Sequence, residues 1–176
     1  MNIPNLLTIL RIVLVPVIVW AISQGAMGLA LVIFVIAGVT DGIDGFIAKN
    51  FDQRTELGAF LDPIADKTLL VSIYVSLAIF GFIPVWLTIL VVSRDVMIVV
   101  GVLLSYLIDK PLIMNPLAVS KANTAVQIVF AALILASQGL GLELGMMITF
   151  VMWTVATLTL ASAAVYVRDF LRHMAT

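Results

Sequence analysis

Residues 41–67 read DGIDGFIAKNFDQRTELGAFLDPIADK, and they concentrate the charge of the chain. Six of its ten acidic residues and three of its nine basic residues fall within this stretch, whereas the sequence on either side is almost wholly apolar. This contrast predicts two apolar helices that are joined by a short charged connection at residues 50–56. Such a short connection makes the two helices antiparallel neighbours, with their acidic ends facing each other.

The composition of the whole chain predicts an integral membrane protein. Of its 176 residues, 63% are hydrophobic and 11% are charged, and the mean hydropathy is +1.24. A water-soluble domain needs more surface charge than this, and a membrane-spanning helix needs about 20 apolar residues. We therefore expect an all-α membrane protein in which residues 1–176 form a single domain. Its six membrane-spanning helices are predicted at about residues 5–23, 26–49, 57–80, 84–108, 118–137 and 144–168.

The distribution of Lys and Arg predicts the orientation of these helices. The three short connections near residues 24–25, 81–84 and 138–141 contain neither residue type. The opposite helix ends carry Lys49, Arg54, Lys110, Lys121, Arg168 and Arg172. Because positive charge is retained on the cytoplasmic side, both termini are expected in the cytoplasm. Residues 12–22 also resemble the core of a signal peptide, but apolar sequence resumes directly afterwards, which favours an uncleaved first span.

Other classes of chemistry are excluded by the composition. The net charge is −1 and no basic groove is visible in the sequence, so we expect no nucleic-acid partner. The chain has no cysteine, which rules out disulfides and thiolate catalysis.

Four aspartates of the charged stretch have helical spacing. Asp41 and Asp44 are three residues apart, and Asp62 and Asp66 are four residues apart. Each spacing places both carboxylates on one face of a helix. The two pairs are therefore expected to converge at the cytoplasmic ends of the second and third spans.

A divalent cation is the simplest way to hold four carboxylates together, because bare carboxylates repel one another. Oxygen-only ligands favour Mg²⁺ or Mn²⁺, and two such ions form the clamp used in many phosphoryl displacements. We expect two ions here. One alternative is that the aspartates are solvated charges paired with nearby Lys and Arg. Another is a cation transporter with intramembrane Asp residues, which would place the acids nearer the bilayer midplane.

The pattern D-x2-D-G-x2-A-K-x8-G-x3-D-x3-D runs from Asp41 to Asp66. It resembles the signature of the CDP-alcohol phosphatidyltransferases, in which Arg usually stands at the position of Lys49. The opening segment NIPNLLTILRI is similar to the start of the phosphatidylglycerophosphate and cardiolipin synthase branches. The resemblance implies a six-helix membrane core, a homodimer and a place in the bacterial cytoplasmic membrane, with the active site facing the cytoplasm.

The resemblance also implies a reaction: transfer of a phosphatidyl group from CDP-diacylglycerol to an alcohol, with release of CMP. The four aspartates would bind Mg²⁺ or Mn²⁺, and Asp66 would also be the base that deprotonates the alcohol. Lys is a point charge, so it would bind the donor's diphosphate less well than the planar fork of Arg. The positions expected to contact CDP-diacylglycerol are Asn5, Thr8, Gly45, Ala48, Lys49, Thr55 and Gly58.

Two further segments bear on the acceptor alcohol. Arg94 and Asp95 fall inside the fourth expected span, where charge is costly. They would form either an ion pair between helices or a site for the acceptor's phosphate. Ser120 and Lys121 open the fifth span, where capping and snorkelling compete with a second anion-binding patch. The segments RDVM and SKANTAVQ resemble the cardiolipin synthases of eukaryotic type, which favours phosphatidylglycerol as acceptor; glycerol 3-phosphate is the alternative.

Overall fold

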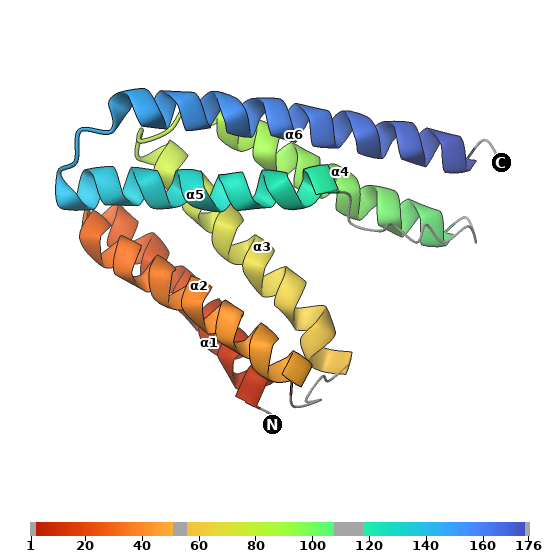
Figure 1. Ribbon diagram of the computed structural model, residues 1–176, viewed down its shortest axis with the longest axis horizontal. Coiled ribbons are helices and arrows are strands. Elements are labelled where there is room, and N and C mark those ends of the chain that lie inside the picture. The colour runs from red at the N-terminus through yellow and green to blue at the C-terminus, as the bar shows by residue number, and fades with distance from the viewer. Residues whose placement is uncertain (1–2, 51–55, 108–117, 175–176) are drawn as a thin grey trace. The chain divides into compact units, whose positions relative to one another are not determined.

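The computed structural model describes residues 3–50, 56–107 and 118–174, and the side chains of residues 8–43, 64–101 and 118–172. Within these ranges the chain is all-helical (Figure 1). The helices are α1 (Ile3–Ser23), α2 (Met27–Asn50), α3 (Glu56–Ile79), α4 (Val85–Leu107), α5 (Ala118–Leu140) and α6 (Gly145–Met174). Each of them lies where the hydropathy pattern predicts a helix, so the all-α class is confirmed.

The surface of the helices is apolar to an unusual degree. Residues 118–140 and 145–172 are each long and apolar enough to cross a membrane, and shorter apolar stretches cover residues 8–23 and 27–43. Large apolar side chains are exposed on all six helices, among them Val13, Val32, Ile79, Ile89, Ile128 and Phe150. Extended exposed apolar surface is typical of contact with lipid or with another protein. The number of spans and their orientation remain predictions.

The three connections without Lys or Arg are tight turns, each of which contains a glycine with positive φ. These residues are Gly25, Gly81 and Gly141, with φ of 69°, 78° and 65°. At the first turn, the amide of Gly25 donates to the carbonyl of Ile22, and the amide of Ala26 donates to that of Ala21. This is the Schellman arrangement, in which a left-handed residue ends a helix and the freed carbonyls are satisfied. The turns predicted from Gly and Pro are therefore present.

Two helices run further than predicted. We expected α5 to end near residue 137, but it continues through Gly139 to Leu140. Gly139 provides a close approach to another helix rather than a turn, because its position leaves no room for a Cβ beside Gly28. Similarly, α6 continues to Met174 rather than ending near residue 168. Hydropathy marks where apolar sequence stops, whereas helical hydrogen bonding continues through polar residues that favour the helix.

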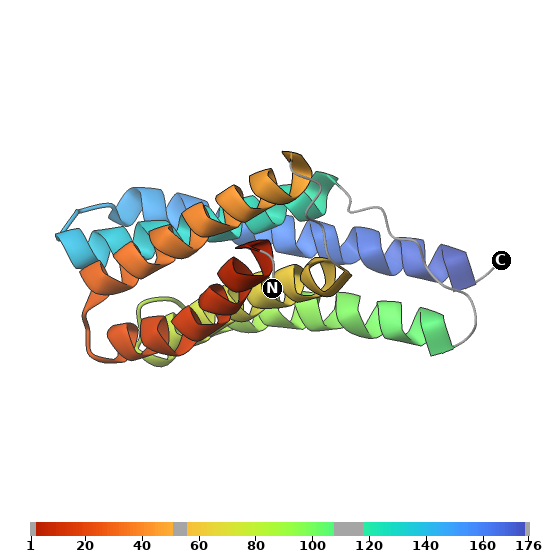
Figure 2. The same cartoon turned by 90° about the horizontal axis from the view of Figure 1, so that it is seen from below.

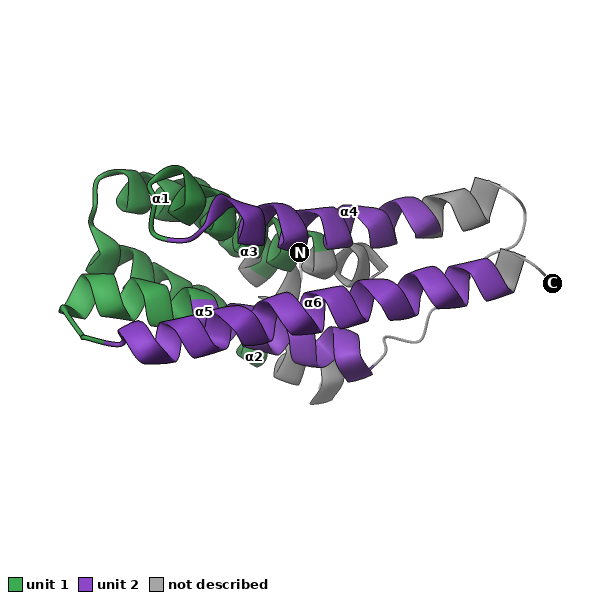
Figure 3. Ribbon diagram, turned by 90° about the horizontal axis from the view of Figure 1, so that it is seen from above, with its two compact units in different colours: residues 1–82, 131–143 green, residues 83–130, 144–176 purple. Residues whose placement is uncertain are grey.

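Contacts divide the chain into two compact units (Figure 3). The first comprises residues 1–82 and 131–143, and the second comprises residues 83–130 and 144–176. In the first unit, α1 packs against both α2 and α3, and its course beside α3 is visible in Figure 2. In the second unit, α4 packs against α6. The single domain over the whole chain remains a prediction.

Candidate active site

Three charged side chains from three helices meet in the first unit. Arg11 of α1 lies with its Nη2 atom 2.8 Å from an oxygen of Asp41 on α2. Its Nη1 atom donates a hydrogen bond to the Oδ1 atom of Asp66 on α3. The Arg11 side chain is 1% exposed, whereas Asp41 and Asp66 are 47% and 48% exposed. The structure thus brings together two of the four predicted carboxylates, one from each predicted pair.

The buried face of α1 explains why these groups meet. Thr8, Arg11, Ile18 and Ile22 are at most 1% exposed. Their spacings of three, seven and four residues place them along one stripe of the helix. The apolar end of this stripe packs in the core of the unit. Its polar end places Arg11 between α2 and α3, at the level of the two carboxylates.

This donor set fits a hard divalent cation. Carboxylate oxygens from α2 and α3 already converge on one positive group, and such oxygens are the ligands that Mg²⁺ and Mn²⁺ prefer. Asp44 belongs to α2 and Asp62 to α3, three and four residues from the described pair, but their side chains lie outside the described residues. Among the side chains that the structure describes, no three metal-ligating groups come together. The complete four-carboxylate site therefore remains a prediction.

The predicted donor-binding positions are mostly outside the described part of the chain. Thr8 is described, and it is fully buried one helical turn before Arg11. Six positions lie outside the residues whose side chains are described: Asn5, Gly45, Ala48, Lys49, Thr55 and Gly58. Their contacts with CDP-diacylglycerol remain predictions.

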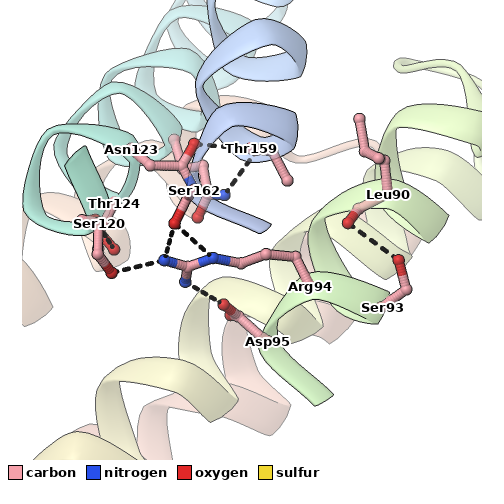
Figure 4. Close-up of polar contacts among 10 residues, drawn as sticks. Leu90, Ser93, Arg94, Asp95, Ser120, Asn123, Thr124, Thr159 and Ser162 are labelled. Atoms are coloured by element: carbon pink, nitrogen blue, oxygen red, sulfur yellow. Dashed lines mark hydrogen bonds and ion pairs between the residues drawn. The ribbon is translucent and has the colours of Figure 1, made fainter. Parts of the chain in front are cut away.

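A second polar cluster lies in the second unit, around Arg94 of α4 (Figure 4). The Arg94 side chain is 3% exposed, and its Nη1 atom is 2.8 Å from Asp95. Its Nη2 atom donates to the hydroxyls of Ser120 and Ser162, each at 2.5 Å, and its Nε atom donates to Ser162 at 3.1 Å. The guanidinium also lies over the ring of Tyr166, 5.5 Å from its centroid. Arg94 therefore links α4 to both α5 and α6.

The ion pair that the structure describes for Arg94 is with its neighbour Asp95 on the same helix, α4. The described links of Arg94 to α5 and α6 are hydrogen bonds to serine hydroxyls and the contact with the Tyr166 ring. Ser120 contacts Arg94, whereas Lys121 is exposed and no described contact joins it to Arg94. The role of both residues toward the acceptor remains a prediction.

A chain of buried polar groups continues from this cluster. The hydroxyl of Thr159 donates to Oδ1 of Asn123 at 2.9 Å, and Nε2 of Gln127 lies 3.5 Å from the same hydroxyl. Asn123 is fully buried, and its Nδ2 atom has no hydrogen-bond partner among the described residues. Figure 4 shows this Thr159–Asn123 pair together with Arg94 and its serine partners. The cluster thus has hydrogen-bond donors to offer to an oxygen-rich group.

Several members of these clusters were not predicted from the sequence. Arg11 was not assigned to the site, and neither Thr159, Ser162 nor Tyr166 was singled out. The three residues of α6 lie at spacings of three and four, so they form a polar stripe within an apolar helix. This polar stripe is the sequence feature from which the three residues of α6 could have been predicted. The sequence holds no comparable signal for Arg11, because its partners lie 30 and 55 residues away.

Comparison with known proteins identifies the class of protein to which this chain belongs. Residues 1–165 match the family model described as CDP-alcohol phosphatidyltransferase. The match covers most of the chain and includes α2, α3 and all members of the two polar clusters except Tyr166. The chain belongs to the CDP-alcohol phosphatidyltransferase family, as the sequence pattern predicted.

Individual relatives have names that fit the two branches considered above. The chain is 40% identical over 152 residues to the human protein named cardiolipin synthase (CMP-forming), which corresponds to 77% of this chain and 50% of that protein. It is 44% identical over 100 residues to a protein of Mycobacterium tuberculosis named probable phosphatidylglycerophosphate synthase, covering 53% of this chain and 48% of that protein. The chain thus spans about half the length of these relatives.

Proposed function

We propose that this chain transfers a phosphatidyl group from CDP-diacylglycerol to phosphatidylglycerol, giving cardiolipin and CMP. The observation that carries the proposal is the convergence of Asp41 and Asp66, from two helices, on one positive group. Membership of the family supports CDP-diacylglycerol as the donor substrate. The name of the human relative, cardiolipin synthase (CMP-forming), supports cardiolipin and CMP as the products. We further propose that Asp41, Asp44, Asp62 and Asp66 hold two Mg²⁺ or Mn²⁺ ions.

In the proposed step, Asp66 accepts the proton of the acceptor's free terminal hydroxyl. The hydroxyl oxygen forms a bond to the phosphatidyl phosphorus of CDP-diacylglycerol. The bond from that phosphorus to the oxygen shared with CMP breaks, and its electron pair leaves with CMP. The bound ions would offset the negative charge of the diphosphate and of the leaving CMP. Lys49 would bind the donor's diphosphate, and Gly45 and Gly58 would let the nucleotide approach the helices closely.

The choice of acceptor is supported by the charge of the Arg94 cluster. Asp95 lies 2.8 Å from Arg94, so it offsets most of the positive charge that the guanidinium brings. The remaining groups, Ser120, Ser162 and Asn123, are neutral hydrogen-bond donors. Such a cluster suits the hydroxyls and the singly charged phosphodiester of phosphatidylglycerol better than the doubly charged phosphate of glycerol 3-phosphate.

Glycerol 3-phosphate is nevertheless the second candidate acceptor. The identity of 44% with a protein named probable phosphatidylglycerophosphate synthase favours it. Lys121, which is exposed at the start of α5, would then provide additional positive charge for the phosphate. The chemistry at the donor would be the same.

We propose that the protein crosses the membrane six times with both termini in the cytoplasm, as the distribution of Lys and Arg indicates. The exposed apolar side chains on all six helices support a lipid environment. A homodimer in a bacterial cytoplasmic membrane, with the active site open to the cytoplasm, is proposed from the family resemblance alone.

The test is an assay of the purified chain in vesicles with CDP-diacylglycerol and Mg²⁺ or Mn²⁺. Phosphatidylglycerol and glycerol 3-phosphate are supplied in separate reactions, and CMP is measured. We expect metal-dependent CMP release with phosphatidylglycerol and its loss on chelation. CMP release only in the reaction with glycerol 3-phosphate would show that this alcohol, and not phosphatidylglycerol, is the acceptor. The absence of CMP release with either alcohol would overturn the proposed activity.

A further inference from the structure

Arg11 carries a full positive charge inside the first unit, and the transfer step above does not use it. It is the largest of the fully buried side chains that the structure describes. A buried charge is costly unless it is paired and hydrogen-bonded. Its partners Asp41 and Asp66 are the two described carboxylates of the proposed metal site. The location of Arg11 is thus tied to that site rather than to the surface.

We propose that Arg11 is a positioning residue for the metal-binding carboxylates. It holds Asp41 of α2 and Asp66 of α3 in fixed relative positions, so that both are in place when the divalent cation binds. This inference rests on the proposed metal-dependent function. It adds a role for α1, whose other expected contribution is the contact of Asn5 and Thr8 with the donor.

The geometry explains why the residue is arginine. One end of the guanidinium, Nη2, contacts Asp41, and the other end, Nη1, contacts Asp66. The planar fork therefore spans two helices with a single rigid group. Lysine has one ammonium group on a flexible stem, so it preserves the charge without fixing the separation of two carboxylates.

Arg11 and a metal ion are able to contact the same two carboxylates at the same time. Each carboxylate has two oxygens with about four acceptor positions, so the contact with Arg11 does not use its full capacity. Arg11 lies on the buried side, whereas both carboxylates are about half exposed and remain accessible from the other side. Groups that orient metal ligands in this way typically change metal affinity by about 10–100-fold when they are mutated.

The test is the affinity of the purified full chain in detergent for Mn²⁺, measured by electron paramagnetic resonance without either lipid substrate. Arg11→Lys retains the charge, and we expect it to bind Mn²⁺ about tenfold more weakly at unchanged helix content. Arg11→Met is expected to lose more affinity. Arg168→Lys is the matched control, because Arg168 pairs with Asp169 at an exposed position, 2.9 Å away. Its Mn²⁺ affinity should equal that of the wild type.

A double-variant cycle separates positioning from a general effect on folding. If Arg11 acts through Asp41, then Arg11→Lys has a smaller effect in an Asp41→Asn background than alone. Additive losses, or a folded Arg11→Lys variant that binds Mn²⁺ as tightly as the wild type, would overturn the inference. If the wild-type protein binds no Mn²⁺, the proposed metal-dependent function itself is contradicted. If Arg11→Met does not fold, Arg11→Lys and the cycle still decide the question.

Discussion

Gly139 on α5 and Gly28 on α2 are in contact backbone to backbone. A Cβ added to Gly139 would lie 2.6 Å from the nitrogen and 2.7 Å from the Cα of Gly28. No side chain fits at that distance, so the two helices are closer here than any residue except glycine permits. Close approach through small residues is a common way for helices to associate in lipid, where burial of apolar surface gives little driving force.

Gly139→Ala is therefore expected to destabilise the first unit. The added methyl group meets rigid backbone rather than a flexible side chain, so α2 or α5 must shift, at a cost of about 1–3 kcal/mol. Thermal unfolding in detergent should show a lower Tm. Gly145→Ala is the matched control, because nothing lies within 4 Å of the new Cβ there. Equal Tm values for the two variants would mean that α2 and α5 are not packed as described.

Asp66→Asn should remove the base while leaving the donor in place. Asparagine keeps an oxygen for Arg11 but does not accept the proton of the acceptor hydroxyl. General-base catalysis contributes about 100-fold or more to the rate, and we expect at least that loss in kcat. Binding of CDP-diacylglycerol, measured by calorimetry, should be largely retained. Asp169→Asn, at an exposed ion pair on α6, should have wild-type activity; a normal rate for Asp66→Asn would refute its role.

Lys49→Arg tests the one departure from the family pattern. An arginine fork makes two parallel hydrogen bonds to a phosphate, whereas lysine acts as a point charge. We expect the KM for CDP-diacylglycerol to fall several-fold, with little change in the KM for the acceptor. An unchanged or higher donor KM would show that Lys49 does not contact the diphosphate.

Arg94→Lys tests the second polar cluster. Lysine cannot reproduce the hydrogen bonds of Arg94 to Asp95, Ser120 and Ser162 at the same time. We expect kcat/KM for the acceptor to fall about tenfold or more, while the KM for CDP-diacylglycerol stays near the wild-type value. Arg168→Lys provides the exposed control. A parallel loss for donor and acceptor would indicate that Arg94 serves only to hold α4, α5 and α6 together.

Much of this fold follows from local sequence. Each helix contains a run of apolar residues, and α1, α3 and α5 are each followed by a glycine with positive φ, namely Gly25, Gly81 and Gly141. Hydropathy and turn residues therefore locate most of the helices. The aspartate spacing likewise indicates which carboxylates share a helix face. The exception is Gly139, whose role depends on a helix more than one hundred residues away. A sequence pattern does not distinguish a glycine in a turn from a glycine at a helix crossing.

The partners of buried charges could not be predicted in the same way. Whether Arg11 contacts Asp41 and Asp66 depends on the rotation of α1 about its axis and on its packing against α2 and α3. The partners of Arg94 depend similarly on the packing of α4 against α6 and on the polar stripe of that helix. Local spacing describes one helix at a time, whereas these contacts are properties of three helices together.

The most direct test of the central claim is the fate of the acceptor's oxygen. Phosphatidylglycerol labelled with ¹⁸O at its terminal hydroxyl is incubated with CDP-diacylglycerol, Mg²⁺ and the purified chain, and the products are analysed by mass spectrometry. We predict cardiolipin and CMP in equal amounts, with the label retained in cardiolipin and absent from CMP. Cardiolipin formed without CMP, or no cardiolipin at all, would contradict the proposed transfer.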